Sequence, residues 1–272
     1  MESLTALKAR LDRLYATYGP AYTFEDPISF PRSFARDDDR EVAGFIASAL
    51  AYGRRAQIRR SVSSLLGYLG KNPARSLASL DPRKASRDLE GFRHRFNTGG
   101  DAAILLLILS RLRRDHGTLN EAFLKGYDPS HEDAGPGLTA FCSRALGTDI
   151  HPLSRSGRVP ARAGARFFFP SPESGSACKR LNMFLRWMVR RDAVDLGVWK
   201  GLPPSKLLVP VDTHVARVSR SLGLTARRAA DWRTAVEVTG RLREIDPEDP
   251  VRYDFALFTW GVETAGRRDG VH

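Results

Sequence analysis

The chain has 272 residues, 42% of them hydrophobic, and carries 43 Lys and Arg against 31 Asp and Glu, a formal net charge of +12. The apolar content is ample for a buried core and excludes disorder as the default. The excess of cations is typical of proteins that meet a polyanion, so nucleic acid is the leading partner class, although a GC-rich genome gives the same bias.

Apolar runs and cysteines restrict the protein class further. The longest apolar run, Ala102 to Leu109, is far shorter than the roughly 20 residues that span a bilayer, and no signal peptide is evident. We therefore expect a cytoplasmic protein that does not contact a membrane. Two cysteines, Cys142 and Cys178, are too few for a four-cysteine zinc or iron–sulfur site. We expect no cofactor, no metal ion and a monomeric protein.

The first half of the chain is predicted to be helical. Leucines at heptad-like spacing predict a first helix that ends at Tyr18-Gly19-Pro20. The segment EVAGFIASALAYG, which follows three aspartates, and the stretch from Arg54 to Leu69 predict the next two long helices. The segment from Asp101 to Leu112 is so apolar that we expect the most buried helix there.

The second half shows the same helical pattern after a long interruption. Residues 151–175 are rich in Pro, Gly and Ser, which predicts a basic loop. Ser176 to Arg191 predicts a helix with the serine as its N-cap, and two more helices are expected at Trp232–Glu244 and Tyr253–Val262. The only strand signal is the short stretch RFFF. The predicted fold class is therefore all-α.

An aspartate begins the helix predicted in VPVDTHVARVSRSLGLT. In isolation, Asp212 in this position is an N-cap whose side chain accepts hydrogen bonds from the first helix amides. The whole string, however, resembles the VDTHV-x-RV segment of the helix-hairpin-helix (HhH-GPD) DNA glycosylase superfamily, which includes the endonuclease III-like enzymes. The resemblance implies that Asp212 is the essential carboxylate, facing the sugar of a flipped-out nucleotide and stabilising the positive charge that develops there.

Members of this superfamily that also nick the strand carry a nucleophilic lysine just after a glycine-containing hairpin. The corresponding stretch is PSPESGSACKRL, in which Lys179 matches the nucleophile and Gly175 and Ser176 belong to the hairpin, although alanine replaces the second hairpin glycine. The Schiff base of such a lysine permits β-elimination. A solvated surface cation is the alternative, and a nucleophile at Lys200 or Lys206 would imply a different hairpin.

The spacing of the two residues narrows the resemblance. Asp212 follows Lys179 by 33 positions, a longer separation than in endonuclease III-like enzymes. In this the chain is similar to the archaeal 8-oxoguanine DNA glycosylases, whose lysine helix has a K-x-L-N-like pattern. The combination of GSACKRLNMFLRWMVR with PVDTHVARVSR is also similar to an uncharacterised bacterial family known only as a domain of unknown function. The resemblance covers about Pro170 to Val262 and leaves residues 70–165 without a role.

Further site residues are expected from their positions. Besides Gly175 and Ser176, the candidates for contacts with DNA phosphates are His214, Arg217 and Arg220. A structural histidine and solvated arginines are the alternatives. The candidates for the pocket that holds the extruded base are Phe169, Asn182 and Trp187. Aromatic residues at such positions more often belong to the core.

Taken together, the resemblance implies an all-α, two-lobed helix-hairpin-helix DNA glycosylase fold with a DNA-binding cleft between the lobes. One lobe would consist of residues 40–198 and carry the lysine helix, and the other of residues 1–39 and 199–272. The expected function, at the nucleoid, is base-excision repair of double-stranded DNA. An oxidised purine such as 8-oxoguanine would be removed with AP lyase activity through a Schiff base of Lys179. Two alternatives stay open: a non-catalytic DNA-binding protein of the same fold, and a monofunctional glycosylase in which water attacks.

Overall fold

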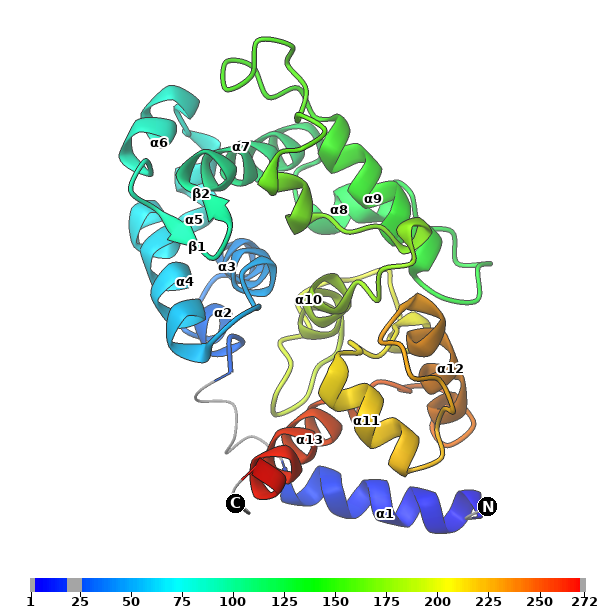
Figure 1. The fold of residues 1–272 in the computed structure, drawn as a ribbon. Coiled ribbons are helices and arrows are strands. Elements are labelled where there is room, and N and C mark those ends of the chain that lie inside the picture. The colour runs from blue at the N-terminus through cyan, green and yellow to red at the C-terminus, as the bar shows by residue number, and fades with distance from the viewer. Residues whose placement is uncertain (1–2, 19–25, 270–272) are drawn as a thin grey trace. The chain divides into compact units, whose positions relative to one another are not determined.

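The computed structural model describes residues 3–18 and 26–269. They divide into two compact units. The interior unit consists of residues 27–130 and 135–171, and the terminal unit of residues 3–18, 26, 131–134 and 172–269. Within the described residues, thirteen α-helices and one two-stranded hairpin form the regular structure, with a few short 3-10 turns (Figure 1). The predicted all-α class is confirmed.

The interior unit is built around α7 (Gly99–His116), which packs against α5, α6, α8 and α9. Helix α7 begins with a capping box between Thr98 and Asp101, continues through an apolar run and ends at Gly117, whose φ is 86°. The other elements of this unit are α2 (Ser29–Arg32), α3 (Asp37–Ala49), α4 (Arg55–Leu69), α5 (Pro73–Ala78), α6 (Pro82–Asp88), β1 (Arg93–His94), β2 (Asn97–Thr98), α8 (Leu119–Leu124), α9 (Gly135–Gly147) and the 3-10 turn η2 (Gly164–Phe168). None of the described helices is both long and apolar enough to cross a membrane.

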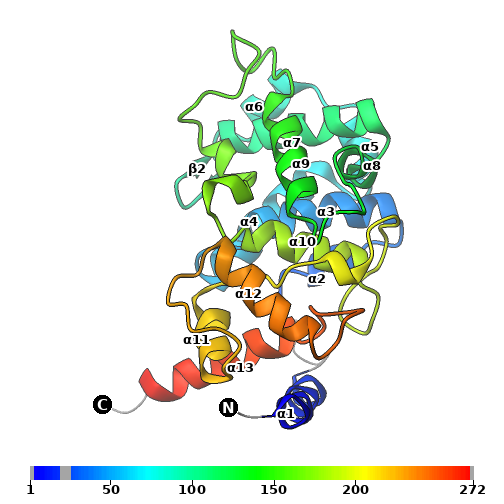
Figure 2. The same ribbon diagram turned by 90° about the vertical axis from the view of Figure 1, so that its right-hand side faces the viewer.

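The terminal unit is organised by close packing of α11 on α13, two helices that lie side by side in both views (Figures 1 and 2). A Cβ atom at Gly261 of α13 would lie 3.2 Å from His214 Cβ and from Val218 Cγ2 of α11, so the two helices approach more closely at this glycine than a larger residue would comfortably allow. The elements of this unit are α1 (Leu4–Thr17), η3 (Pro172–Ser174), α10 (Lys179–Val189), η4 (Pro204–Lys206), α11 (Thr213–Ser221), α12 (Trp232–Arg243) and α13 (Asp254–Asp269).

Helix α10 lies in the terminal unit, whereas we expected it in a lobe that ends at residue 198. The carbonyl groups of Trp187 and Met188 accept hydrogen bonds from the amides of Leu196 and Trp199, at 2.9 and 2.7 Å. The Trp199 ring also packs edge-on against Phe184 of α10, with centroids 5.2 Å apart. These contacts join α10 to the chain that follows it, which places the boundary of the unit before the helix, at residue 172.

Three local expectations are corrected. The strand expected in RFFF is absent, because Gly164–Phe168 forms the 3-10 turn η2, and the hairpin lies instead in RHRFNT. The N-cap of α10 is Cys178 rather than Ser176. We expected the most buried helix in the segment that forms α7. Helix α10 buries a larger share of its residues, because its polar side chains are buried together with its apolar ones. Of the predicted Tyr18-Gly19-Pro20 break, Tyr18 caps α1 and the other two lie outside the described residues.

Two glycines of the interior unit give a matched test of this packing. A Cβ at Gly99 would lie 1.8 Å from the carbonyl oxygen of Leu89, so Gly99→Ala should lower the free energy of unfolding by roughly 1–3 kcal/mol. Gly67 lies exposed in α4 with nothing within 4 Å of such an atom, and Gly67→Ala should raise stability by about 0.5–1 kcal/mol. Urea denaturation measures both, and equal effects of the two substitutions would contradict the packing described.

Candidate functional site

Lys179 and Asp212 form an ion pair in the terminal unit. The Nζ atom of Lys179 lies 3.0 Å from Oδ2 of Asp212. Lys179 is the first residue of α10, and Asp212 is the N-cap of α11. The side chains are 28% and 19% exposed, so both functional groups are partly buried and still reach solvent. The fold therefore brings together the two residues that the sequence resemblance singled out.

The two oxygens of Asp212 have different partners. Oδ1 accepts hydrogen bonds from the amides of His214 and Val215, each at 2.9 Å, and thereby caps α11, while Oδ2 contacts Lys179. Burial alone would raise the pKa of Asp212. The positive charge of Lys179 and the amide of Val215 outweigh that effect and lower the pKa below its ordinary value. Asp212 is thus a fixed anion with one oxygen available at the site.

The chain reaches Lys179 through a turn that is docked on the start of α12. Gly175 has a φ of 76°, in the left-handed region, and its carbonyl oxygen accepts a hydrogen bond from the amide of Trp232, at 3.1 Å. Ser176 forms an isolated β-bridge with Asp231. The two residues that we expected to bind DNA therefore also fix the path of the backbone into α10.

Cys178 sets the orientation of the first turn of α10. It is a buried, non-glycine residue with a φ of 46°, and its amide donates a hydrogen bond to Ser176 Oγ, at 3.2 Å. The side-chain amide of Asn182, one turn into the helix, donates to the carbonyl oxygen of Ala177 at 3.1 Å. Asn182 is only 2% exposed, so its amide stabilises the turn and faces no open pocket.

Phe258 of α13 lies beneath the ammonium group of Lys179. Its ring centroid is 5.1 Å from Nζ, a distance at which a cation is attracted to an aromatic face. The ring of His214 packs edge-on against the same phenylalanine, with centroids 6.4 Å apart. Phe258 was missed in the sequence because it belongs to an apolar helical pattern that core residues share.

A second carboxyl group, Asp254, is buried behind this pair. It begins α13 and is 4% exposed, and its Oδ2 accepts a hydrogen bond from Nη1 of Arg186. Its Oδ1 has no hydrogen-bond partner among the described residues. Burial raises the pKa of Asp254 to about 6, although the charge of Arg186 opposes this shift, and the charge of Asp212 adds to it. The sequence shows only an acidic residue at a helix start, which is common at exposed positions.

Arg186 connects Asp254 to a larger buried ion cluster. Its Nε atom lies 3.2 Å from Oδ1 of Asp195. The other oxygen of Asp195, Oδ2, binds Nη1 of Arg190. Nη2 of Arg190 lies 2.8 Å from Asp249 Oδ2. Both arginine side chains are about 5% exposed or less, and a buried cation requires such carboxylate partners. The cluster thus holds α10 against the start of α13, where Asp254 lies.

The two arginines expected on the surface of α11 are used within the unit. Nη2 of Arg217 donates hydrogen bonds to the carbonyl oxygen of Gly261 and, at 3.2 Å, to Thr264 Oγ1, both in α13. Nη1 of Arg220 donates to the carbonyl oxygen of Arg227, at 3.3 Å. These contacts hold neighbouring segments against α11, and phosphate binding by either arginine stays a prediction.

The predicted base pocket is corrected at its two aromatic positions. Phe169 belongs to the interior unit, is 2% exposed and packs against Phe45 with ring centroids 5.5 Å apart. Trp187 is completely buried in α10. Both rings fill the core, as large apolar side chains usually do, and offer no face to a base.

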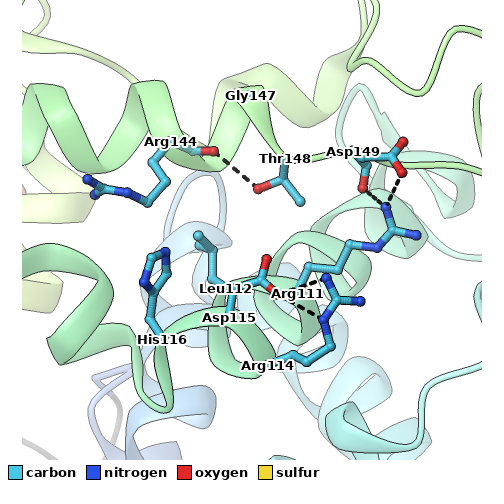
Figure 3. Close-up of a pocket in the computed structure, with 9 residues that line it drawn as sticks. All are labelled: Arg111, Leu112, Arg114, Asp115, His116, Arg144, Gly147, Thr148 and Asp149. Atoms are coloured by element: carbon cyan, nitrogen blue, oxygen red, sulfur yellow. Dashed lines mark hydrogen bonds and ion pairs between the residues drawn. The ribbon is translucent and has the colours of Figure 1, made fainter. Parts of the chain in front are cut away.

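A pocket of about 380 Å³ lies elsewhere, where the C-terminal ends of α7 and α9 meet in the interior unit (Figure 3). Arg111 points toward Asp149, at 3.1 Å, and donates a hydrogen bond to the carbonyl oxygen of His151, at 2.6 Å. Arg144 donates to the carbonyl oxygen of Ala122, at 2.8 Å. Cations at helix C-termini offset the negative end of the dipole, which gives these arginines a structural role. No residue of the predicted site lines this pocket.

The fold and the ion pair define an all-α protein in which a lysine and an aspartate meet at the N-termini of two helices. The family described as protein of unknown function (DUF2400) matches residues 26–263, and the chain belongs to this family. No curated protein and no solved structure matches the chain. Within the described residues, no three His, Cys, Asp or Glu side chains are placed to hold a metal ion.

The elevated pKa of Asp254 makes a prediction about stability. Between pH values of about 4 and 6 the folded protein retains this proton more than the unfolded chain does, so ionisation of Asp254 lowers stability as the pH rises. Asp254→Asn removes that loss. From pH ~4.5 to pH ~6.5 the wild type should therefore lose on the order of 2 kcal/mol more unfolding free energy than the variant.

Urea denaturation at the two pH values measures the difference. Asp115→Asn, in which an exposed carboxylate of the interior unit is lost, is the control for removal of one negative charge. Identical pH dependence in the wild type and Asp254→Asn would show that the carboxyl group of Asp254 has an ordinary affinity for protons.

Proposed function

We propose that this protein is a DNA glycosylase with associated AP lyase activity, in which Lys179 is the nucleophile and Asp212 the charged partner. The observation that carries the proposal is the 3.0 Å contact between Lys179 Nζ and Asp212 Oδ2 at the starts of α10 and α11. The resemblance of the VDTHV segment to the helix-hairpin-helix glycosylases supports this reaction class. The partial exposure of both side chains would give a sugar access to them.

Asp212 is suited to stabilise positive charge rather than to hold a proton. Its pKa is lowered, and its Oδ1 is fixed by two amides, so the carboxylate stays ionised and needs no reorganisation when charge develops. Cleavage of an N-glycosidic bond leaves positive charge on the deoxyribose. A fixed anion next to the attacking amine lowers the energy of that state.

The proposed reaction begins with attack of the lysine on the sugar. Lys179 forms a bond to C1′ while the bond from C1′ to the base breaks, and the base leaves with the electron pair and takes up the proton that the amine releases. The C1′–O4′ bond then breaks, O4′ takes up a proton from water, and a protonated Schiff base forms between Nζ and C1′. Loss of a proton from C2′ then expels the 3′ phosphate, and water finally hydrolyses the Schiff base to regenerate the amine.

The substrate part of the proposal is an oxidised purine, such as 8-oxoguanine, in double-stranded DNA. It is supported by the similarity of the Lys179–Asp212 separation to that of the archaeal 8-oxoguanine glycosylases and by the formal net charge of +12. A location at the nucleoid follows from this substrate. A two-lobed arrangement with a DNA-binding cleft stays a prediction from the resemblance.

Borohydride trapping tests the assignment of the nucleophile. With duplex DNA that contains one 8-oxoguanine or one abasic site, the wild type should form a covalent adduct in sodium borohydride, and Lys179→Gln should form none. Asp212→Asn retains an oxygen that can cap α11 and should still fold, but adduct formation should slow by about 10²–10³-fold because the fixed charge is lost. Circular dichroism establishes that the variants are folded.

Lys200→Gln and Lys206→Gln are the matched controls, because each removes another lysine of the terminal unit, and both should trap like the wild type. Loss of the adduct in one of these controls, but not in Lys179→Gln, would refute the assignment. Release of the base without an adduct would indicate attack by water. Binding of DNA with neither base release nor an adduct on either substrate would indicate a protein that only binds DNA.

A further inference from the structure

Two exposed phenylalanines lie side by side in the interior unit, far along the chain from Lys179. Phe96, in the two-residue turn of the β1–β2 hairpin, is 57% exposed, and Phe167 of η2 is 39% exposed. Their ring centroids are 4.8 Å apart, and the Tyr52 ring lies 5.8 Å from Phe96 and 4.9 Å from Phe167. These three rings, which we call the aromatic tip, expose apolar faces that the core does not use.

Buried polar groups hold the aromatic tip in place. The hydroxyl group of Tyr52 donates a hydrogen bond to Oδ1 of Asn97 and contacts the carbonyl oxygen of His94, at 3.3 Å. The imidazole of His94 is completely buried and forms a hydrogen bond with Ser61 Oγ, at 2.9 Å. The hairpin is therefore fixed to the ring of Tyr52 and to α4.

Asp101 fixes Phe167 to the same hairpin. Its Oδ2 accepts a hydrogen bond from the amide of Thr98 in β2, at 2.9 Å, and its Oδ1 accepts one from the amide of Ala165 in η2, at 2.7 Å. A Cβ at Gly164 would lie 2.6 Å from Asp101 Oδ2, so the close approach of η2 requires glycine. The rings of the aromatic tip are thus positioned in advance of any contact with a partner.

The turn itself has a disfavoured backbone conformation. Arg95 has a φ of 53°, in the left-handed region that arginine seldom adopts. Its side chain lies over Gly53, where an added Cβ would be 2.9 Å from Arg95 Cδ. This strained turn carries Phe96. Because the ring of Phe96 is exposed, burial of apolar surface does not offset the conformational cost of the turn. Strain retained without a gain in packing points to a function of the exposed residue.

The surroundings of the aromatic tip are strongly positive. Residues 52–60 and 91–98 contain six arginines and no aspartate or glutamate. Helix α4, which follows Tyr52, packs next to β1 (Figure 1). All six of these arginines are exposed, namely Arg54, Arg55, Arg59, Arg60, Arg93 and Arg95. The surface therefore combines exposed aromatic rings with cations and would attract a partner that carries both flat rings and negative charge.

We propose that the aromatic tip is a stacking platform for the bases of an unpaired nucleic-acid strand. Phe96 contacts a base, and Arg93 and Arg95 contact the phosphates. Nucleic acid fits both halves of the surface, because every base offers a flat face to an aromatic ring and every nucleotide carries a negative charge. This platform lies wholly in the interior unit and does not depend on the chemistry of Lys179.

Affinity measurements with the full chain test the platform. The probes are fluorescein-labelled single strands of about 20 nucleotides, one of DNA and one of RNA, together with the DNA duplex of the same sequence, in ~100 mM salt. Phe96→Ala and Phe96→Leu should weaken single-strand binding by about tenfold, whereas Phe96→Tyr should bind like the wild type because it keeps an aromatic face. The DNA and RNA arms distinguish the two sources of unpaired bases.

Two further variants separate stacking from other effects. Leu4→Ala removes an exposed apolar side chain, 46% exposed, from the terminal unit and should leave binding unchanged. Arg95→Gln should weaken binding to all strands and reduce the slope of log K against log salt by about one. Because Phe96 is exposed, its variants should unfold at nearly the same urea concentration as the wild type.

Equal affinities of Phe96→Ala and the wild type would overturn the proposal, as would a wild type that binds none of the strands. Self-association that is lost in Phe96→Ala, without nucleic-acid binding, would also overturn it and assign the aromatic tip to a protein contact. Failure of borohydride trapping would contradict the proposed glycosylase activity and leave the platform proposal unaffected. Unchanged single-strand affinity of Phe96→Ala, together with normal trapping, would refute the platform proposal alone. The two proposals therefore fail independently.

Discussion

The carboxylate of Asp212 serves two helices at once. One oxygen satisfies the first amides of α11, and the other neutralises the lysine that begins α10. Because each helix contributes its N-terminus, two positive dipole ends surround a single negative charge. The cap and the ion pair are thus consequences of one residue, and the chemistry we propose uses a charge that the fold already needs.

The third element of the site is α13, which packs against α11. Helix α13 supplies Phe258 beneath the ammonium group and the buried Asp254 behind it, and it packs closely on α11 at Gly261. Arg186 in α10 binds the carboxylates of Asp195 and Asp254, and Arg190 at the end of α10 binds that of Asp249. Tertiary contacts thus determine how closely the amine and the carboxylate approach, in addition to local helix capping.

The sequence predicted those parts of the site that depend on local rules. An aspartate before an apolar helical repeat predicts an N-cap, and a helix in SACKRLNMFLRWMV follows from its periodicity, so Asp212 and the approximate position of Lys179 could be placed. The left-handed Cys178 could not, because nothing in the sequence shows that a cysteine will adopt a conformation typical of glycine.

Trp187 and Phe169 were assigned to a pocket because apolar residues look alike in sequence whether they line a cavity or fill a core. The β1–β2 hairpin was missed because its strands contain two residues each, too few to show an alternating pattern.

Both cysteines of the chain, Cys142 and Cys178, are buried thiols, and burial raises the pKa of the Cys178 thiol to about 12. Thiol reagents attack the ionised form, so this thiol is protected both by its inaccessibility and by its retained proton. A cysteine introduced on the surface would consequently be the one reactive thiol. A single dye or spin label could then be attached to the β1–β2 hairpin or to the start of α10 without removal of any native residue.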